Sequence, residues 1–179
     1  ETQDMVANPW DSQFWLFFPD VEFGEGQTVT VSMEVRAEKD ATSGTQTHSG
    51  PGGYRHWMGI GTVAFTTDWT EYTYTGKIEG AMVGSNAFAF NLNDFKEANK
   101  YYFDNISLKL DGVELVSNGN LDGDDMTNFI AKEYPNPGAD ATSYARKIES
   151  YTIEVPGGRT PLTPEEKKDT LMWAMDNWI

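Results

Sequence analysis

The chain contains no cysteine among its 179 residues, which excludes disulfides, thiol catalysis and thiolate metal sites. Basic residues are scarce, because 13 lysines and arginines stand against 28 aspartates and glutamates, giving a formal net charge of -15. Such a polyanion repels nucleic-acid phosphates and anionic membrane surfaces, so we expect neither nucleic acid nor membrane as a partner. No apolar run approaches the roughly 20 residues of a membrane-spanning helix.

Motifs of the common enzyme classes are missing as well. The sequence has no G-x-S-x-G, no H-E-x-x-H, no G-x-G-x-x-G and no Walker loop. The only histidines, His48 and His56, lie far from any recognisable third ligand, so zinc is not indicated. An enzyme with a pair of catalytic carboxylates stays open as an alternative, because such a pair is defined in space and not by sequence spacing.

Aromatic residues concentrate in the stretch Asn8–Phe18, where five of eleven residues are Trp or Phe. Strands accommodate this density readily. One side of such a strand, which we interpret as core, would carry Trp10, Ser12, Phe14, Leu16 and Phe18. The other side mixes rings with a carboxylate and an amide, in Asp11, Gln13, Trp15 and Phe17. This second side suits sugar binding, because rings stack on pyranose C–H groups and amides bond hydroxyls. The alternative is a strand buried between two sheets.

Further predicted strands follow one another with turn signals between them. Residues 28–37 alternate apolar and polar side chains, and Asp111-Gly112 predicts a two-residue hairpin turn after a strand at 101–110. Two glycines, Gly59 and Gly61, predict a bulge or a close backbone approach in a strand near residues 54–65. We expect residues 1–7 to fray and residues 38–53 to form a loop with at most a short strand. The pattern predicts an all-β fold, a jelly-roll β-sandwich of two antiparallel sheets.

The pattern changes to that of a short C-terminal α-helix near Thr163. Thr163 is a predicted N-cap, Pro164 suits the first helical position, and Glu166 completes a capping box. Apolar residues then recur at helical spacing up to Trp178. This helix has no obvious partner in an all-β domain, so we expect it to be dispensable for folding and binding.

Polar and aromatic residues recur on the predicted strands. Four segments together resemble a family 4 carbohydrate-binding module, of the family 4/9/22 group, over about residues 5–110: Asn8–Phe14, Gln46–Trp57, Phe90–Leu92 and Tyr102–Leu108. The resemblance implies a jelly-roll sandwich whose cleft binds single chains of β-1,4-xylan or β-glucan. The carbohydrate-binding residues that we expect are Trp10, Gln13, Gln46, His48, Tyr54, His56 and Asn91.

The same resemblance implies a structural calcium ion held by Asp104, for which hard oxygen ligands are suitable. The Asn-Gly motif with which the family opens is missing before Trp10, but a counterpart, Asn118–Gly123, follows the closing strand. We therefore expect residues 113–155 to complete the sandwich in permuted order, or to complete a neighbouring molecule. In the first arrangement Asp122 would approach Asp104 and help to hold the calcium.

Residues 161–178 resemble a helix of family 10 endo-β-1,4-xylanases of the gut Bacteroides type, whose catalytic domains are (β/α) barrels. The resemblances together imply a binding module at 1–158 and a fragment of a catalytic barrel at 159–179. They imply a non-catalytic chain, secreted or exposed on a bacterial cell, that binds xylan and targets a linked xylanase to it. The alternatives are a β-glucan or cellulose chain as ligand, and a calcium-stabilised spacer that binds no ligand.

Overall fold

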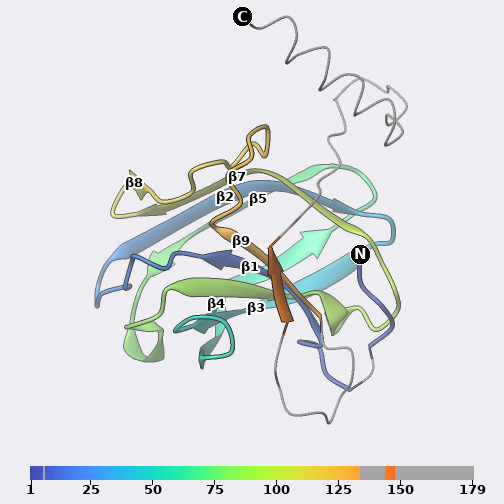
Figure 1. The fold of residues 1–179 in the computed structure, drawn as a ribbon, viewed down its shortest axis with the longest axis horizontal. Helices are drawn as coiled ribbons and strands as arrows, with labels where there is room; N and C mark the ends of the chain where they lie inside the picture. Colours follow the sequence, from blue (N-terminus) through green and yellow to red (C-terminus); the bar gives the residue numbers. More distant parts are fainter. Residues whose placement is uncertain (6, 134–143, 148–179) are drawn as a thin grey trace, which may run out of the picture. The chain divides into compact units, whose positions relative to one another are not determined.

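The structure is a computed structural model that describes residues 1–5, 7–133 and 144–147. Its described strands form two antiparallel sheets (Figure 1). The six-stranded sheet has the order β10 (Tyr144–Lys147), β9 (Phe129–Glu133), β1 (Ser12–Phe17), β6 (Ala87–Asn91), β3 (Ala41–His48) and β4 (Tyr54–Phe65). The four-stranded sheet has the order β5 (Thr70–Lys77), β2 (Thr28–Ala37), β7 (Tyr101–Leu110) and β8 (Val113–Glu114). Two short 3-10 helices are η1 (Gly80–Met82) and η2 (Leu92–Asp94).

This architecture confirms the predicted β-sandwich of two antiparallel sheets. The predicted C-terminal helix, the boundary at residue 158 and the barrel fragment at 159–179 lie outside the described residues. Within the described part of the chain, no helix is long and apolar enough to cross a membrane.

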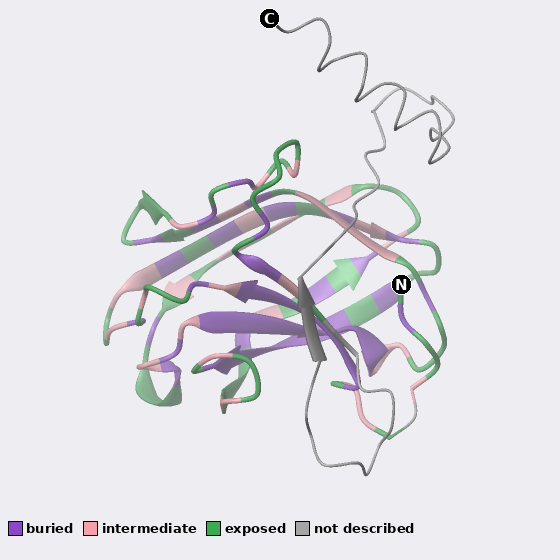
Figure 2. Ribbon diagram, viewed as in Figure 1, coloured by how far each residue is buried: buried purple, intermediate pink, exposed green. Residues whose placement is uncertain are grey.

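The core lies between the two sheets and follows from strand alternation. In β2 the four apolar side chains from Val29 to Val35 are buried, with polar residues between them, so the strand turns one face inward as predicted. Figure 2 shows this alternation along β2 as a banded ribbon. Across the sandwich, the ring of Phe14 in β1 stacks on Phe103 of β7 with centroids 4.3 Å apart. The ring of Phe103 also contacts the rings of Phe65 and Phe90, with centroids 5.4 and 5.6 Å away.

The predicted hairpin after β7 is also confirmed. Both turn residues have positive φ, 50° at Asp111 and 83° at Gly112, which is the type I′ geometry that matches the twist of the flanking strands. The Asp111 carboxylate accepts a hydrogen bond from the Thr28 backbone N–H at 2.8 Å. The turn is thereby tied to the start of β2.

The expected loop at 38–53 is wrong for its central part, because Ala41–His48 is a full strand between β6 and β4. Its inward positions carry Ser43, Thr45 and Thr47, which are fully buried. Thr45 Oγ1 donates to the Gly61 carbonyl at 2.7 Å and accepts from the Ile60 N–H at 3.1 Å. Small hydroxyl side chains thus fill positions that hydrophobic periodicity would assign to larger apolar residues.

The bulge predicted around Gly59 is present in β4. The register between β3 and β4 shifts between Gly44 and Gln46, so β4 carries extra residues there. A Cβ atom on Gly59 would lie 2.4 Å from Cγ2 of Thr47. Only glycine allows this approach without movement of a neighbour.

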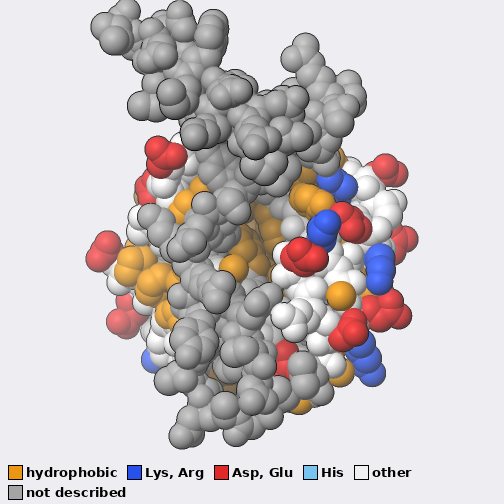
Figure 3. Space-filling model, turned by 45° about the vertical axis from the view of Figure 1, so that its right-hand side comes forward, with side chains coloured by type: hydrophobic (Ala, Val, Ile, Leu, Met, Phe, Trp, Pro, Cys, Tyr) orange, Lys and Arg blue, Asp and Glu red, His pale blue; other side chains and the backbone are white. Residues whose placement is uncertain are grey.

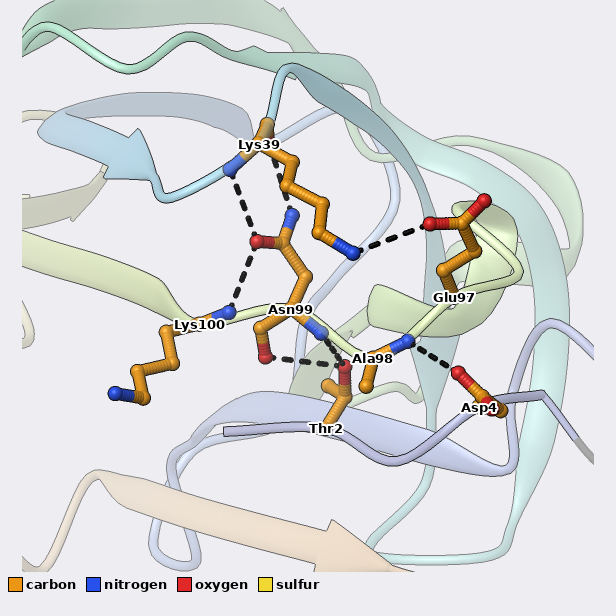
Figure 4. A network of polar contacts seen from close by, with 7 residues as sticks. All are labelled: Thr2, Asp4, Lys39, Glu97, Ala98, Asn99 and Lys100. Atoms are coloured by element: carbon orange, nitrogen blue, oxygen red, sulfur yellow. Dashed lines mark hydrogen bonds and ion pairs between the residues drawn. The ribbon is translucent and has the colours of Figure 1, made fainter.

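The expected fraying of residues 1–7 is wrong, because the first residues dock on the loop before β7 (Figure 4). Thr2 is buried, and its N–H donates to the Asn99 carbonyl at 2.8 Å. The Asp4 carboxylate accepts from the Ala98 N–H at 2.7 Å. The Asn99 side chain in turn bonds the backbone of Lys39 through both its oxygen and its nitrogen, at 3.0 and 2.9 Å. A composition that is merely polar does not reveal these partners, which come from distant parts of the chain.

The segment after the hairpin returns to both sheets. The Ile106 N–H of β7 donates to the Gly119 carbonyl at 2.8 Å, and a Cβ on Gly119 would lie 1.8 Å from the Ile106 carbonyl oxygen. Farther on, β9 pairs antiparallel with β1, and Phe129 is buried against Phe14 at 6.2 Å between centroids. The described part of residues 113–155 therefore pairs with strands from residues 10–110 of the same chain.

Candidate functional site

One face of the six-stranded sheet is turned away from the four-stranded sheet, and we call it the distal face. Its side chains alternate with the core residues on β1, β3, β6 and β9, so Gln13 is opposite Asn91 while Phe14 is opposite Phe90. The distal face comprises Gln13, Trp15 and Phe17 of β1, Gly44, Gln46 and His48 of β3, Ala87, Ala89 and Asn91 of β6, and Ile130 of β9.

A row of amide and imidazole groups crosses this face. Gln13 Nε2 donates to Asn91 Oδ1 at 2.8 Å and to Gln46 Oε1 at 3.2 Å. The same Gln46 oxygen lies 2.9 Å from His48 Nε2. Because an amide oxygen only accepts, His48 carries its proton on Nε2 here. The row thus fixes the orientation of three amides and one imidazole before any ligand arrives.

One donor of the row is left over. Asn91 is fully buried, and its Nδ2 has no hydrogen-bond acceptor among the described residues. A buried polar group without a partner is costly, and such groups in native proteins commonly meet a water, an ion or a ligand. Asn91 therefore offers a free donor to an oxygen from outside the described chain.

Trp15 forms the apolar floor beside the row. Its side chain is fully buried and clusters with the two small residues Ala87 and Ala89 of β6. Its ring lies 4.3 Å from the His48 ring, and His48 meets the edge of Tyr54 at 5.7 Å. The sequence placed Trp15 on the same side of the strand as Gln13, apart from the core rings, but it did not predict that this ring would be fully buried.

The edge strand β4 adds exposed rings to this face. Trp57 is opposite Gln46 and Tyr54 is opposite His48 in the register with β3, and both are exposed, by 40% and 56%. His56 lies between them, opposite Thr47, whose side of the strand belongs to the core. The structure therefore does not bring His56 to the amide row.

Trp10 precedes β1 and does not share its alternation. Asp11 closes a turn at Asn8–Asp11 by accepting from the N–H groups of Ala7 and Asn8 at 2.7 and 2.9 Å. The Pro9 carbonyl accepts from the Asn93 N–H at 3.1 Å, so the turn lies beside η2, at the end of β6. Trp10 is 41% exposed, and its interpretation as a core residue is wrong because the strand begins only at Ser12.

Of the expected sugar-binding residues, Gln13, Gln46, His48 and Asn91 therefore form one bonded row, and Tyr54 adjoins it. Trp15 and Asp94, which were not among the expected residues, also lie at this face. Asp94 lies in η2, and its Oδ2 accepts from the Gly44 N–H at 2.5 Å. Nothing in the local sequence distinguishes this aspartate from the many surface carboxylates.

The two residues expected to hold calcium lie on the other sheet and its following loop. Asp104 of β7 is directly opposite Glu34 of β2. Burial raises the pKa of Asp104, and the charges of Glu34 and Asp122 raise it further, while the Asn105 N–H lowers it. Asp104 and Asp122 are therefore near enough to interact. Their oxygens suit a hard cation, but the described residues include no group of three or more carboxylates or histidines that could hold a metal.

Acidic side chains are spread around the edge of the surface in Figure 3, in keeping with the net charge of -15. A neutral ligand meets no electrostatic barrier on such a surface, whereas a polyanion does.

Comparison with known proteins supports the fold. No protein-family model and no curated protein matches the chain. Among solved structures, the one described as "PbXyn10C CBM APO", a carbohydrate-binding module, is similar at a TM-score of 0.59 and 16% identity, over 80% of each chain. The one described as "CBM4 structure and function" is similar at a TM-score of 0.47 and 19% identity, over 60% of this chain and 66% of that one. The chain thus has the β-sandwich fold of a carbohydrate-binding module.

Proposed function

We propose that the chain is a non-catalytic carbohydrate-binding module that binds xylan, a chain of β-1,4-linked xylose, on the distal face. The observation that carries the proposal is the row Gln13, Gln46, His48 and Asn91, with its free buried donor on Asn91. Sugar hydroxyls both donate and accept, so a row of pre-oriented amides is complementary to them.

Aromatic rings supply the second half of sugar recognition. Tyr54 and Trp57 are exposed at the β4 edge of the distal face, where a pyranose can stack its C–H groups on a ring. Gln13, Gln46 and Asn91 are buried, so the exposed rings make the first contact and the amide row sets the orientation of the bound chain.

The proposal includes a linked endo-β-1,4-xylanase, which the module would hold on hemicellulose at the surface of, or outside, a bacterial cell. Its support is the sequence resemblance of residues 161–178 and the similarity of the fold to a module of PbXyn10C. Tethering raises the effective concentration of an enzyme at its polymer.

The proposal is tested by electrophoresis in native gels that contain xylan, β-glucan or no polysaccharide. We expect retardation by xylan, and a roughly tenfold loss of affinity in Gln13→Ala because two hydrogen bonds of the row disappear. Gln27→Ala is the matched control, since Gln27 bonds Gly24 and Asp111 at the hairpin end and lies off the distal face.

The outcomes separate the rival functions. Retardation by β-glucan and not by xylan would show that β-glucan is the ligand, and the distal face would remain the proposed binding site. Equal mobility in all three gels would refute sugar binding and would favour the alternative of a structural spacer that binds no ligand. Release of reducing sugars from xylan by the chain alone would overturn the non-catalytic assignment.

A further inference from the structure

An exposed ring and a carboxylate meet over Gly44, at the β3–β4 end of the distal face. A Cβ on Gly44 would lie 3.0 Å from Asp94 Oδ2 and 3.1 Å from Cζ2 of Trp57. Both contacts are tighter than side-chain carbons normally allow. The absent side chain therefore lets the indole from β4 and the carboxylate from η2 approach each other across β3.

The carboxylate retains acceptor capacity after it bonds the backbone. Asp94 Oδ2 accepts from the Gly44 N–H at 2.5 Å, and a carboxylate can accept at both oxygens. The described residues provide no side-chain donor to Asp94. Burial raises the pKa of Asp94, and the Gly44 N–H opposes this shift in part, so the charge is held in a partly dry place without a bonded cation.

Lys39, on the loop between β2 and β3, is paired with another residue. Lys39 lies over the ring of Phe95 at 5.8 Å, and its Nζ is 3.1 Å from a Glu97 carboxylate oxygen. This ion pair is visible in Figure 4. Asp94 thus keeps its negative charge without an ion pair among the described residues, on a chain whose net charge is -15.

We propose that Trp57, Gly44 and Asp94 form a subsite for one neutral pyranose ring that carries no acidic substituent. The inference rests on the proposed function and adds a selectivity to it. The indole stacks on the C–H face of the sugar, and Asp94 accepts a hydrogen bond from a ring hydroxyl, which a charged acceptor makes stronger than a neutral one does. A uronic acid at the same position would bring two carboxylates together, so Asp94 disfavours xylan segments with uronic acid side groups.

The experiment is calorimetric titration of the full chain with two probes, xylohexaose and a xylohexaose that carries one glucuronic acid. We expect the wild type to prefer the neutral probe by at least about threefold at low salt, from the repulsion of two charges at separations of several ångströms. Asp94→Asn keeps an acceptor for the Gly44 N–H. It should bind the neutral probe roughly tenfold more weakly, because a charged hydrogen bond is lost, and should no longer discriminate between the probes.

Asp20→Asn is the charge-matched control, because Asp20 is exposed in the turn after Phe18 and lies off the distal face. It should leave both affinities and their ratio unchanged. Gly44→Ala independently tests the close approach of Trp57 and Asp94 to Gly44. This variant should bind both probes more weakly, while its thermal melt stays cooperative.

The two proposals fail in different ways. If the wild type binds xylohexaose and Asp94→Asn leaves both affinities and their ratio unchanged, the subsite is refuted and the module stands. If the wild type binds neither probe, the function itself is refuted, and the subsite with it.

Discussion

At the residue scale, two tryptophans of the aromatic stretch differ in burial from what their positions predict. Period-two alternation assigns Trp10 to the core and Trp15 to the other side. Trp15 is indeed on the distal face but is fully buried, and Trp10 is 41% exposed in a turn. Alternation holds only within a continuous strand, and the Asp11 carboxylate ends that continuity by closing the turn before Ser12. The family resemblance, which implies that Trp10 is a ligand-binding ring, is compatible with its exposure.

We expect Trp10→Ala to weaken xylan binding roughly tenfold to a hundredfold, the equivalent of about 1–3 kcal/mol for the loss of a stacking ring. The fold should survive, because an exposed ring contributes little to the core. Trp69→Ala is the matched control, since Trp69 is 37% exposed and packs near Arg36 and Tyr102 of the four-stranded sheet. Equal retardation of wild type and Trp10→Ala in a xylan gel, with intact melts, would remove Trp10 from the site.

At the element scale, strands with regular apolar alternation could be predicted and β3 could not. β2 was expected at the residues where it is found, and the Asp111-Gly112 turn identified the hairpin because it requires two positive φ values. β3 buries hydroxyls instead of apolar side chains, and its stability comes from partners on β4 and β6. Gln46 and His48 were therefore predicted as residues of the candidate site, but the strand that positions them was not predicted. Asp94 was missed because only the fold brings it to Gly44.

The bulge of β4 gives a prediction of its own. We expect Gly59→Ala to destabilise the protein by about 1–3 kcal/mol, because the new Cβ would overlap the Thr47 methyl group in a packed core. Thr47→Ser removes that methyl group, so the double variant should recover much of the loss, which a double-mutant cycle from thermal melts measures. Strictly additive losses would show that the strain lies elsewhere, since the same Cβ would also lie 3.3 Å from the Phe88 ring.

At the scale of the whole molecule, the sandwich could be predicted from its many short strands, and the position of the Asn118–Gly123 motif led us to expect that residues 113–155 complete it. The docking of the first residues could not be predicted. The first residues dock on the loop at 96–99, and β9 adds to β1 from more than 110 residues away in sequence. These contacts depend on backbone groups and on single side chains such as Asn99, so they leave no periodic signal. The amide row and the acidic group around Asp104 lie on different sheets.

That separation gives the last prediction, that calcium stabilises the chain through Asp104 and Asp122 without changing its affinity for sugar. Burial raises the pKa of Asp104, and the charges of Glu34 and Asp122 raise it further. Like charges so placed repel each other, and a divalent cation bound between them would attract both. At a calcium concentration of about 100 times Kd, the free energy of unfolding should rise by about 2.7 kcal/mol, measured as a higher melting temperature than in a chelator. Asp104→Asn should abolish the calcium-dependent shift, whereas Asp20→Asn should retain it.

Because Asp104 is in the sheet opposite the amide row, titrations with xylohexaose should give the same Kd with calcium and with chelator. Identical melts of the wild type in the two buffers would refute the metal, and a calcium-dependent sugar affinity would refute its separation from the distal face.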